Sequence, residues 1–121
     1  MPYKRGDVIW VYFDLPYQVG ETKEHPAIII SNEDVYYQDE MYIVVMMTSN
    51  GRKDLFTFEL ENNMLLKPQS VEHSQARCHL VTYITNKQIS PGKKAINTLK
   101  EAHVDRLIEM INEISLSSTY F

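Results

Sequence analysis

Residues 7–14 read Asp-Val-Ile-Trp-Val-Tyr-Phe-Asp, and this stretch decides which fold the chain can adopt. Aromatic and β-branched residues fill it between two aspartates, and such residues favour strands. Successive side chains of a strand point to opposite faces. Both faces here are apolar or aromatic: Val8, Trp10 and Tyr12 on one, and Ile9, Val11 and Phe13 on the other. We therefore predict a strand that is buried on both sides.

Four further segments have the features of strands. Residues 26–30 and 41–47 are short, nearly continuous apolar runs between polar turns, which favours buried strands over helices. Residues 55–60 and 75–84 alternate in character from one position to the next, as expected of strands whose two faces differ. The loops between these segments are short, so we expect neighbouring strands to run antiparallel.

The end of the chain has a helical pattern. Thr98 and Glu101 have the spacing of a capping box, which predicts a helix start. Apolar residues then recur at helical spacing: Val104, Leu107, Ile108, Ile111 and Ile114. The fold class that we predict is mainly β, a small barrel or sheet of strongly bent antiparallel strands with one C-terminal α-helix packed on it.

Length, cysteine content and charge exclude several classes of protein. The chain has 121 residues, which predicts a single domain over residues 1–121. Its longest apolar run, residues 41–47, is too short to span a bilayer, so we expect a cytoplasmic protein with no membrane partner. The single cysteine, Cys78, has no zinc-site spacing to other residues, and we expect neither a metal nor another cofactor. The net charge of −4 excludes a broad basic surface but not a local basic site.

Four passages, taken in order, resemble one known family. They match its opening Arg-Gly-Asp strand, its glycine-containing loop and second strand, its third strand ending in threonine, and its late strand: RGDVIWV (5–11), GETKEHPAIIISN (20–32), YIVVMMTS (42–49) and SQARCHLVTYITNKQI (74–89). The family is that of the MazF/PemK toxins. The resemblance implies the CcdB-like, SH3-type barrel of that family, including its closing helix.

The resemblance also implies a function. Members of this family are toxins of type II toxin–antitoxin systems, endoribonucleases that cut single-stranded mRNA without a metal. They generally form homodimers that a cognate antitoxin inhibits. Their catalytic pair is an arginine before the proline of the second strand and a threonine at the end of the third. Thr48 matches the threonine, whereas His25 stands at the arginine position, and Leu80 and Thr82 replace a glutamine and an arginine of the late strand.

Cleavage of RNA without a metal needs a base for the 2′-hydroxyl, an acid for the leaving 5′-oxygen, and donors to the phosphoryl oxygens. His25 can be either the base or the acid, because imidazole titrates near neutral pH. Thr48 and Ser49 can donate hydrogen bonds. Two alternatives stay open for these residues: His25 is also consistent with a loop-end histidine, and Thr48 with an ordinary strand end.

RNA binding calls for cations and a stacking surface, and the barrel can bring several such residues to one groove. The candidates are Lys23, Arg52, Lys53 and Arg77, with Tyr17 as a stacking partner for a base. Cations on turns are more often simply solvated. His79 alternates with Arg77, and it either lines the same groove or is an ordinary surface histidine.

Two functions are therefore compatible with the sequence. The first is a metal-independent endoribonuclease toxin with an antitoxin partner. The second is a catalytically degenerate member of the same fold, which binds protein or nucleic acid as a CcdB-like inhibitor does. In both cases we expect a homodimer, because strands with two apolar faces leave more hydrophobic surface than one helix covers.

Overall fold

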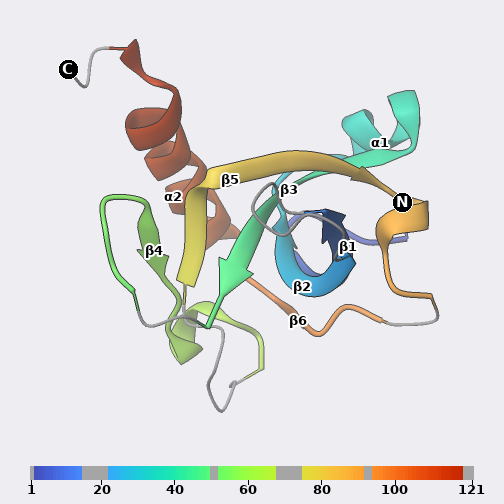
Figure 1. Ribbon diagram of the computed structural model, residues 1–121, viewed down its shortest axis with the longest axis horizontal. Coiled ribbons are helices and arrows are strands. Elements are labelled where there is room, and N and C mark those ends of the chain that lie inside the picture. The colour runs from blue at the N-terminus through green and yellow to red at the C-terminus, as the bar shows by residue number, and fades with distance from the viewer. Residues whose placement is uncertain (1, 15–21, 50–51, 68–74, 92–93, 119–121) are drawn as a thin grey trace.

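The computed structural model describes residues 2–14, 22–49, 52–67, 75–91 and 94–118. Within these residues, six strands form one antiparallel sheet in the order β4-β5-β3-β2-β1-β6 (Figure 1). The strands are β1 (Asp7–Asp14), β2 (Thr22–Ile29), β3 (Met41–Thr48), β4 (Thr57–Glu59), β5 (Gln75–Thr85) and β6 (Asn97–Thr98). The helices are α1 (Glu33–Asp39) and α2 (Glu101–Met110), which continues as a π-helical segment (Ile111–Leu116), and 3-10 turns cover Asn62–Met64 and Asn86–Gln88. The predicted fold class is confirmed.

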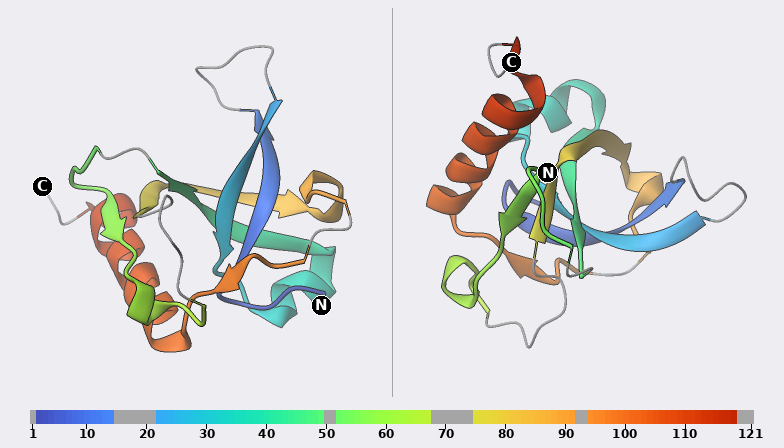
Figure 2. Two further views of the ribbon diagram at one scale, coloured as in Figure 1. Left: turned by 90° about the horizontal axis from the view of Figure 1, so that it is seen from below. Right: turned by 60° about the vertical axis from the view of Figure 1, so that its left-hand side comes forward.

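The sheet curls, and each of its faces carries its own hydrophobic core. One core fills the inside of the curl and includes Ile9, Val11, Phe13, Ala27, Ile29, Tyr42, Val44, Met46, Ile84 and Ile89. The other core packs against α2, which lies beside β4 (Figure 2), and includes Val8, Ile28, Val45, Met47, Phe58, Leu65, Ala76, Cys78, Leu99, Val104, Leu107 and Ile111. Strand β1 contributes to both cores, as its sequence predicts, although its Tyr12 is exposed.

The Arg-Gly-Asp opening joins three elements. The Gly6 amide donates to the carbonyl of Ile29 at 2.7 Å, and the Leu99 amide donates to the carbonyl of Gly6 at 2.8 Å. The carboxylate of the buried Asp7 accepts from the backbone amide of Lys4 at 3.0 Å and from the hydroxyl of Thr98 at 2.8 Å. These bonds tie the start of β1 to the end of β2 and to the segment that leads into α2.

Helix α2 is present where the apolar spacing predicts it, but its predicted capping box is wrong. The N-cap is Lys100, which makes no capping hydrogen bond through its side chain. Thr98 instead lies in β6, opposite Asp7 in the register, and its hydroxyl bonds to that aspartate. Pairing with β1 therefore satisfies Thr98 before the helix begins. Val104, Leu107 and Ile111 are buried as expected.

Helix α1 was not expected from the sequence. Its first turn is polar, none of its residues is buried, and no apolar stripe announces it. Local bonds define it instead. The Asn32 side chain accepts from the Val35 amide at 3.3 Å, and Glu40 ends the helix in the left-handed conformation, with a φ of 52°.

The β3–β5 ladder contains a wide irregularity that proves central to the candidate site. Val45 pairs with Val81, and Met47 pairs with Ala76. Between these pairs β3 has only Met46, whereas β5 has residues 77–80. We call residues 77–80 the β5 bulge. Strand β5 bends sharply along its length (Figure 1), and before the bend it also pairs with β4. A bulge of this kind redirects side chains away from the ladder.

Candidate functional site

A pocket of about 290 Å³ lies beside the β5 bulge. It is lined by side chains from β2, β3, the segment after β3, and β5: His25, Met46, Met47, Thr48, Arg52, Arg77, His79 and Leu80. Four of the eight residues are basic, and the methionines and the leucine form an apolar part of the wall. The structure thus brings together residues that lie far apart in the sequence.

His25 and Thr48 come from neighbouring antiparallel strands. The β2–β3 ladder ends at the pair Ala27–Met46, and His25 and Thr48 each lie two positions further along their strands, at the pocket. His25 is half-buried, its Nε2 atom lies beneath the surface, and its ring centroid is 6.4 Å from that of Phe13. The arrangement expected for these two residues, the start of one strand beside the end of the next, is present.

Arg77 has a bonding pattern different from that of a solvated surface cation. Its Nη1 donates to Asp54 Oδ1 at 3.0 Å and to Gln75 Oε1 at 2.9 Å, and its Nη2 donates to Asp54 Oδ2 at 2.8 Å. A further bond reaches Thr57 Oγ1 at 3.1 Å. Its side chain is only 12% exposed. The bidentate pair with Asp54 neutralises much of the charge of Arg77. Its bonds to three side chains show that Arg77 holds the pocket wall in place.

Gln75 and Asp54 complete this support, and sequence patterns did not point to either. The buried Gln75 donates through Nε2 to the carbonyl of Arg52 at 2.6 Å. Asp54 accepts from the Phe56 amide at 2.9 Å. Hydrogen bonding to Arg77 lowers the pKa of Asp54 from 3.8 to about 2, with the Phe56 amide as a second cause. The segment that carries Arg52 is therefore anchored to β5.

The other predicted RNA-binding residues are distributed unevenly. The Arg52 side chain is 77% exposed at the pocket, and Ser49 is exposed directly after β3. Lys53 points to a different surface pocket and pairs with Glu59. The backbone of Lys23 lies opposite that of Phe13 in the register of the β1–β2 ladder. Tyr17 lies outside the described residues.

His79 lines the pocket, and this is one of the two placements that the sequence left open for it. Its ring packs on Phe56, with the centroids 4.4 Å apart and the planes 38° from parallel. Partial burial lowers the pKa of His79 below its ordinary 6.5, and the charge of Arg77 lowers it further. The neutral imidazole is therefore favoured. The neighbouring Cys78 points into the core instead, where burial raises the pKa of its thiol to about 11.

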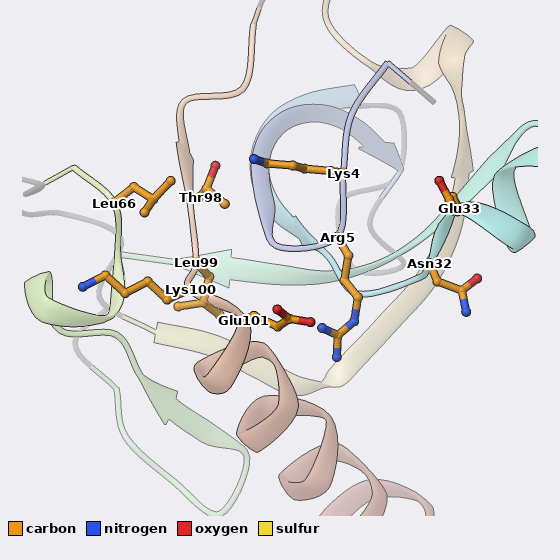
Figure 3. A pocket seen from close by; sticks show the side chains of 9 residues that line it. All are labelled: Lys4, Arg5, Asn32, Glu33, Leu66, Thr98, Leu99, Lys100 and Glu101. Carbon is orange, nitrogen blue, oxygen red and sulfur yellow. The ribbon is translucent and has the colours of Figure 1, made fainter.

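A second cavity, of about 510 Å³, is chemically less suited to a reaction (Figure 3). It lies where β1, α1 and α2 begin, and no histidine lines it. Two of its cations are engaged: Arg5 pairs with Asp105 at 2.6 Å, and Lys100 donates to the carbonyl of Asn63 at 2.8 Å. In the part of the chain that the structure describes, no cluster of His, Cys, Asp or Glu could hold a metal. No helix there is long and apolar enough to cross a membrane.

Comparison with solved structures shows a shared fold at low sequence identity. MazF (Form-I) from Deinococcus radiodurans is 11% identical, with a TM-score of 0.69, covering 93% of this chain and 94% of that one. The MazE–MazF complex (Form-II) from the same organism is 10% identical, with a TM-score of 0.68 and the same coverage. An endoribonuclease in complex with its cognate antitoxin from a Mycobacterial species is 14% identical, with a TM-score of 0.64 and 91% of each chain covered.

No curated protein sequence matches this chain. The family model for the PemK-like, MazF-like toxin of type II toxin–antitoxin systems, by contrast, matches residues 4–115. This match spans nearly the whole sequence and includes all the described residues of the candidate site. The chain therefore belongs to the PemK-like, MazF-like family of type II toxins.

Proposed function

We propose that this protein is a toxin that cleaves single-stranded mRNA as a metal-independent endoribonuclease. The observation that carries the proposal is the convergence of His25 and Thr48, from adjacent strands, on one pocket with Arg52 at its exposed side. A proton-transfer group, a hydroxyl donor and a cation are three of the groups that cleavage by the RNA's own 2′-hydroxyl requires.

In the proposed reaction the 2′-oxygen attacks the adjacent phosphorus and the bond from phosphorus to the 5′-oxygen breaks. The products are a 2′,3′-cyclic phosphate and a free 5′-hydroxyl. His25 is one of the two groups that move protons in this step. Thr48 donates a hydrogen bond to a phosphoryl oxygen, and Arg52 attracts the phosphate through its charge.

The proposal includes partners. The solved relatives include complexes with an antitoxin. For this chain we propose a cognate antitoxin whose acidic, disordered segment covers the pocket and competes with RNA. Because mRNA and the antitoxin are both cytoplasmic, we also propose that the protein acts in the cytoplasm. We propose a homodimer as its assembly.

The test is incubation of the purified protein with mixed-sequence RNA in EDTA, followed by mapping of the new ends. We expect cleavage that leaves a 5′-hydroxyl, and a rate that changes between about pH 5 and 8 because imidazole titrates there. His25→Ala should lower the rate roughly 10²-fold or more, the usual effect of losing an acid or base. Thr48→Val should lower the rate without moving the pH profile, because a hydroxyl does not titrate in this range.

His103→Ala is the matched control, since His103 lies on α2 away from the pocket. Wild-type-like cleavage by His25→Ala would end the catalytic assignment of His25. A wild-type protein that cleaves none of the RNA would overturn the proposed enzyme. That result would support the binding-module alternative, which the apolar wall of Met46, Met47 and Leu80 also favours.

A further inference from the structure

We propose that His79 is the second proton-transfer residue of this pocket, acting as the general base while His25 acts as the general acid. This inference rests on the proposed function, because it assigns the second of the two groups that the cleavage requires. The geometry behind it is that His25 on β2 and His79 in the β5 bulge line one pocket of about 290 Å³, with Met46 of the intervening β3 between them in the sheet.

The β5 bulge is what gives His79 this position. The pairs Val45–Val81 and Met47–Ala76 hold β5 on either side of the bulge. A regular ladder would place the residues between them in direct register with β3. Instead His79 lies outside the register, so its side chain can face the pocket while Cys78 fills the core.

Two contacts hold the bulge backbone, and one holds the ring. The Cys78 amide donates to the carbonyl of Phe56 at 2.9 Å, and the hydroxyl of Ser115 donates to the carbonyl of Cys78 at 2.7 Å. The imidazole packs on the Phe56 ring at 4.4 Å. His79 as a whole stays exposed, so the ring is supported on one side and accessible from the pocket. A catalytic group needs this kind of support, because small displacements lower the rate.

The charged groups around His79 assign its role. Burial and the nearby Arg77 favour the neutral imidazole, with Arg52 acting in the same direction and Asp54 opposing it. His25 is the titratable residue that β2 contributes to the pocket. A neutral imidazole accepts a proton and cannot donate one to a leaving alkoxide, so His79 suits the base and His25 the acid.

The proton transfers then balance. A ring nitrogen of His79 takes the proton of the 2′-hydroxyl while the 2′-oxygen bonds to phosphorus. The bond from phosphorus to the 5′-oxygen breaks, and the His25 imidazolium gives its proton to that oxygen. His79 is left protonated and His25 neutral, and exchange with water restores both.

The experiment uses two RNA substrates with the same sequence. In one of them sulfur replaces the 5′-bridging oxygen of the scissile phosphate, and a thiolate leaves without needing a proton. We expect His25→Ala to lose roughly 10²-fold or more on the ordinary RNA and to recover close to the wild-type rate on the sulfur RNA. His79→Phe keeps an aromatic ring against Phe56 but cannot take a proton, so it should lose a similar factor on both substrates.

The pH profile gives a second measurement. For the wild-type protein we expect the rate on ordinary RNA to rise with pH through an apparent pKa below 6.5, as His79 loses its proton. This rising limb should be absent in His79→Phe. Circular dichroism and thermal unfolding check that the variant is folded, and His103→Ala serves again as the control histidine.

The outcomes separate this inference from the function on which it rests. Ordinary cleavage by a folded His79→Phe would overturn the role of His79 while the proposed endoribonuclease stands. Rescue of His79→Phe by the sulfur RNA, with no rescue of His25→Ala, would overturn the assignment of base and acid. Failure of the wild type on both substrates would overturn the proposed function itself.

Discussion

A Cβ atom built on Gly6 would lie 2.6 Å from the carbonyl oxygen of Leu99, and the φ angle of Gly6 is +98°. Any other residue would meet both the strained backbone and this collision. The obstructing atom is a backbone oxygen, in the segment that leads into α2, so it cannot move aside without shifting the helix. The glycine of the opening motif is thus required by the joint between β1, β2 and α2.

We therefore expect Gly6→Ala to lower the free energy of unfolding by about 2 kcal/mol or more, since a non-glycine residue at positive φ costs about 1–3 kcal/mol before any collision is counted. Urea unfolding measures the change. Glu109→Ala, at an exposed site on α2, is the control and should stay within about 0.5 kcal/mol of the wild type. Equal stability of the two variants would contradict the structural role of Gly6.

At single residues, the sequence predicted where His25 and Thr48 lie relative to one another, but it did not predict the residues that support the pocket. His25 and Thr48 could be placed because the order of two antiparallel strands brings their ends together. Gln75 and Asp54 could not, because each acts through hydrogen bonds to distant partners that no local pattern encodes.

Among the elements, the segment between β3 and β4 is tied to β5 by two side chains of that strand. Arg77 links β5 to Asp54 and Thr57, and Gln75 links the same strand to Arg52. Since Arg52 lines the pocket, the geometry of the site follows from these bonds. The ionised form of Asp54 is needed for its two bonds to Arg77, because a protonated carboxyl would lose the bidentate pair.

This dependence predicts a pH effect. The pKa of Asp54 is lowered in the folded protein to about 2, below its ordinary 3.8, so its stabilising contribution is present above about pH 4 and is lost as the pH falls through about 2. Carboxyl-carbon NMR should show this titration in the wild type. In Arg77→Gln the pKa should move up towards 3.8, and an unchanged pKa would show that Arg77 is not its main cause.

The long, strongly periodic elements were predictable and the irregular ones were not. The final helix follows from its apolar spacing, whereas its start was misassigned because Thr98 pairs with β1 instead of capping α2. Helix α1 was not predicted, because it buries no residue and the periodicity of apolar residues is the signal by which helices are predicted from sequence. The β5 bulge was not predicted, because the register of β5 depends on its partner strand β3 and cannot be read from the sequence of β5 alone.

At the scale of the whole molecule, the strand predicted to be buried on both sides, residues 7–14, belongs to a sheet that carries a hydrophobic core on each face. Helix α2 covers one face, and the sheet's own curl closes the other. Large apolar side chains nevertheless remain exposed on several elements of the described structure, among them Tyr12, Tyr37, Leu66, Val81, Tyr83 and Leu116. Their exposure is compatible with burial against a second copy.

We accordingly expect a homodimer that buries on the order of 1,500 Å² in total, the size of a stable protein interface. Sedimentation velocity at tens of micromolar should give the mass of two chains. Raising the salt concentration should not dissociate the dimer if apolar contacts dominate it. A single species of monomer mass at that concentration would count decisively against this assembly.

The β5 bulge has a consequence for how this protein can change by mutation. Because ladder pairs on either side secure the backbone, the side chains of His79 and Leu80 are largely released from the demands of strand pairing, whereas Arg77 stays paired with Thr57 of β4. Leu80 is accommodated there, at the pocket wall, without loss of the sheet. Mutation at positions 79 and 80 can therefore replace reactive groups and alter the substrate preference while the scaffold, and with it the yield of folded protein, is preserved.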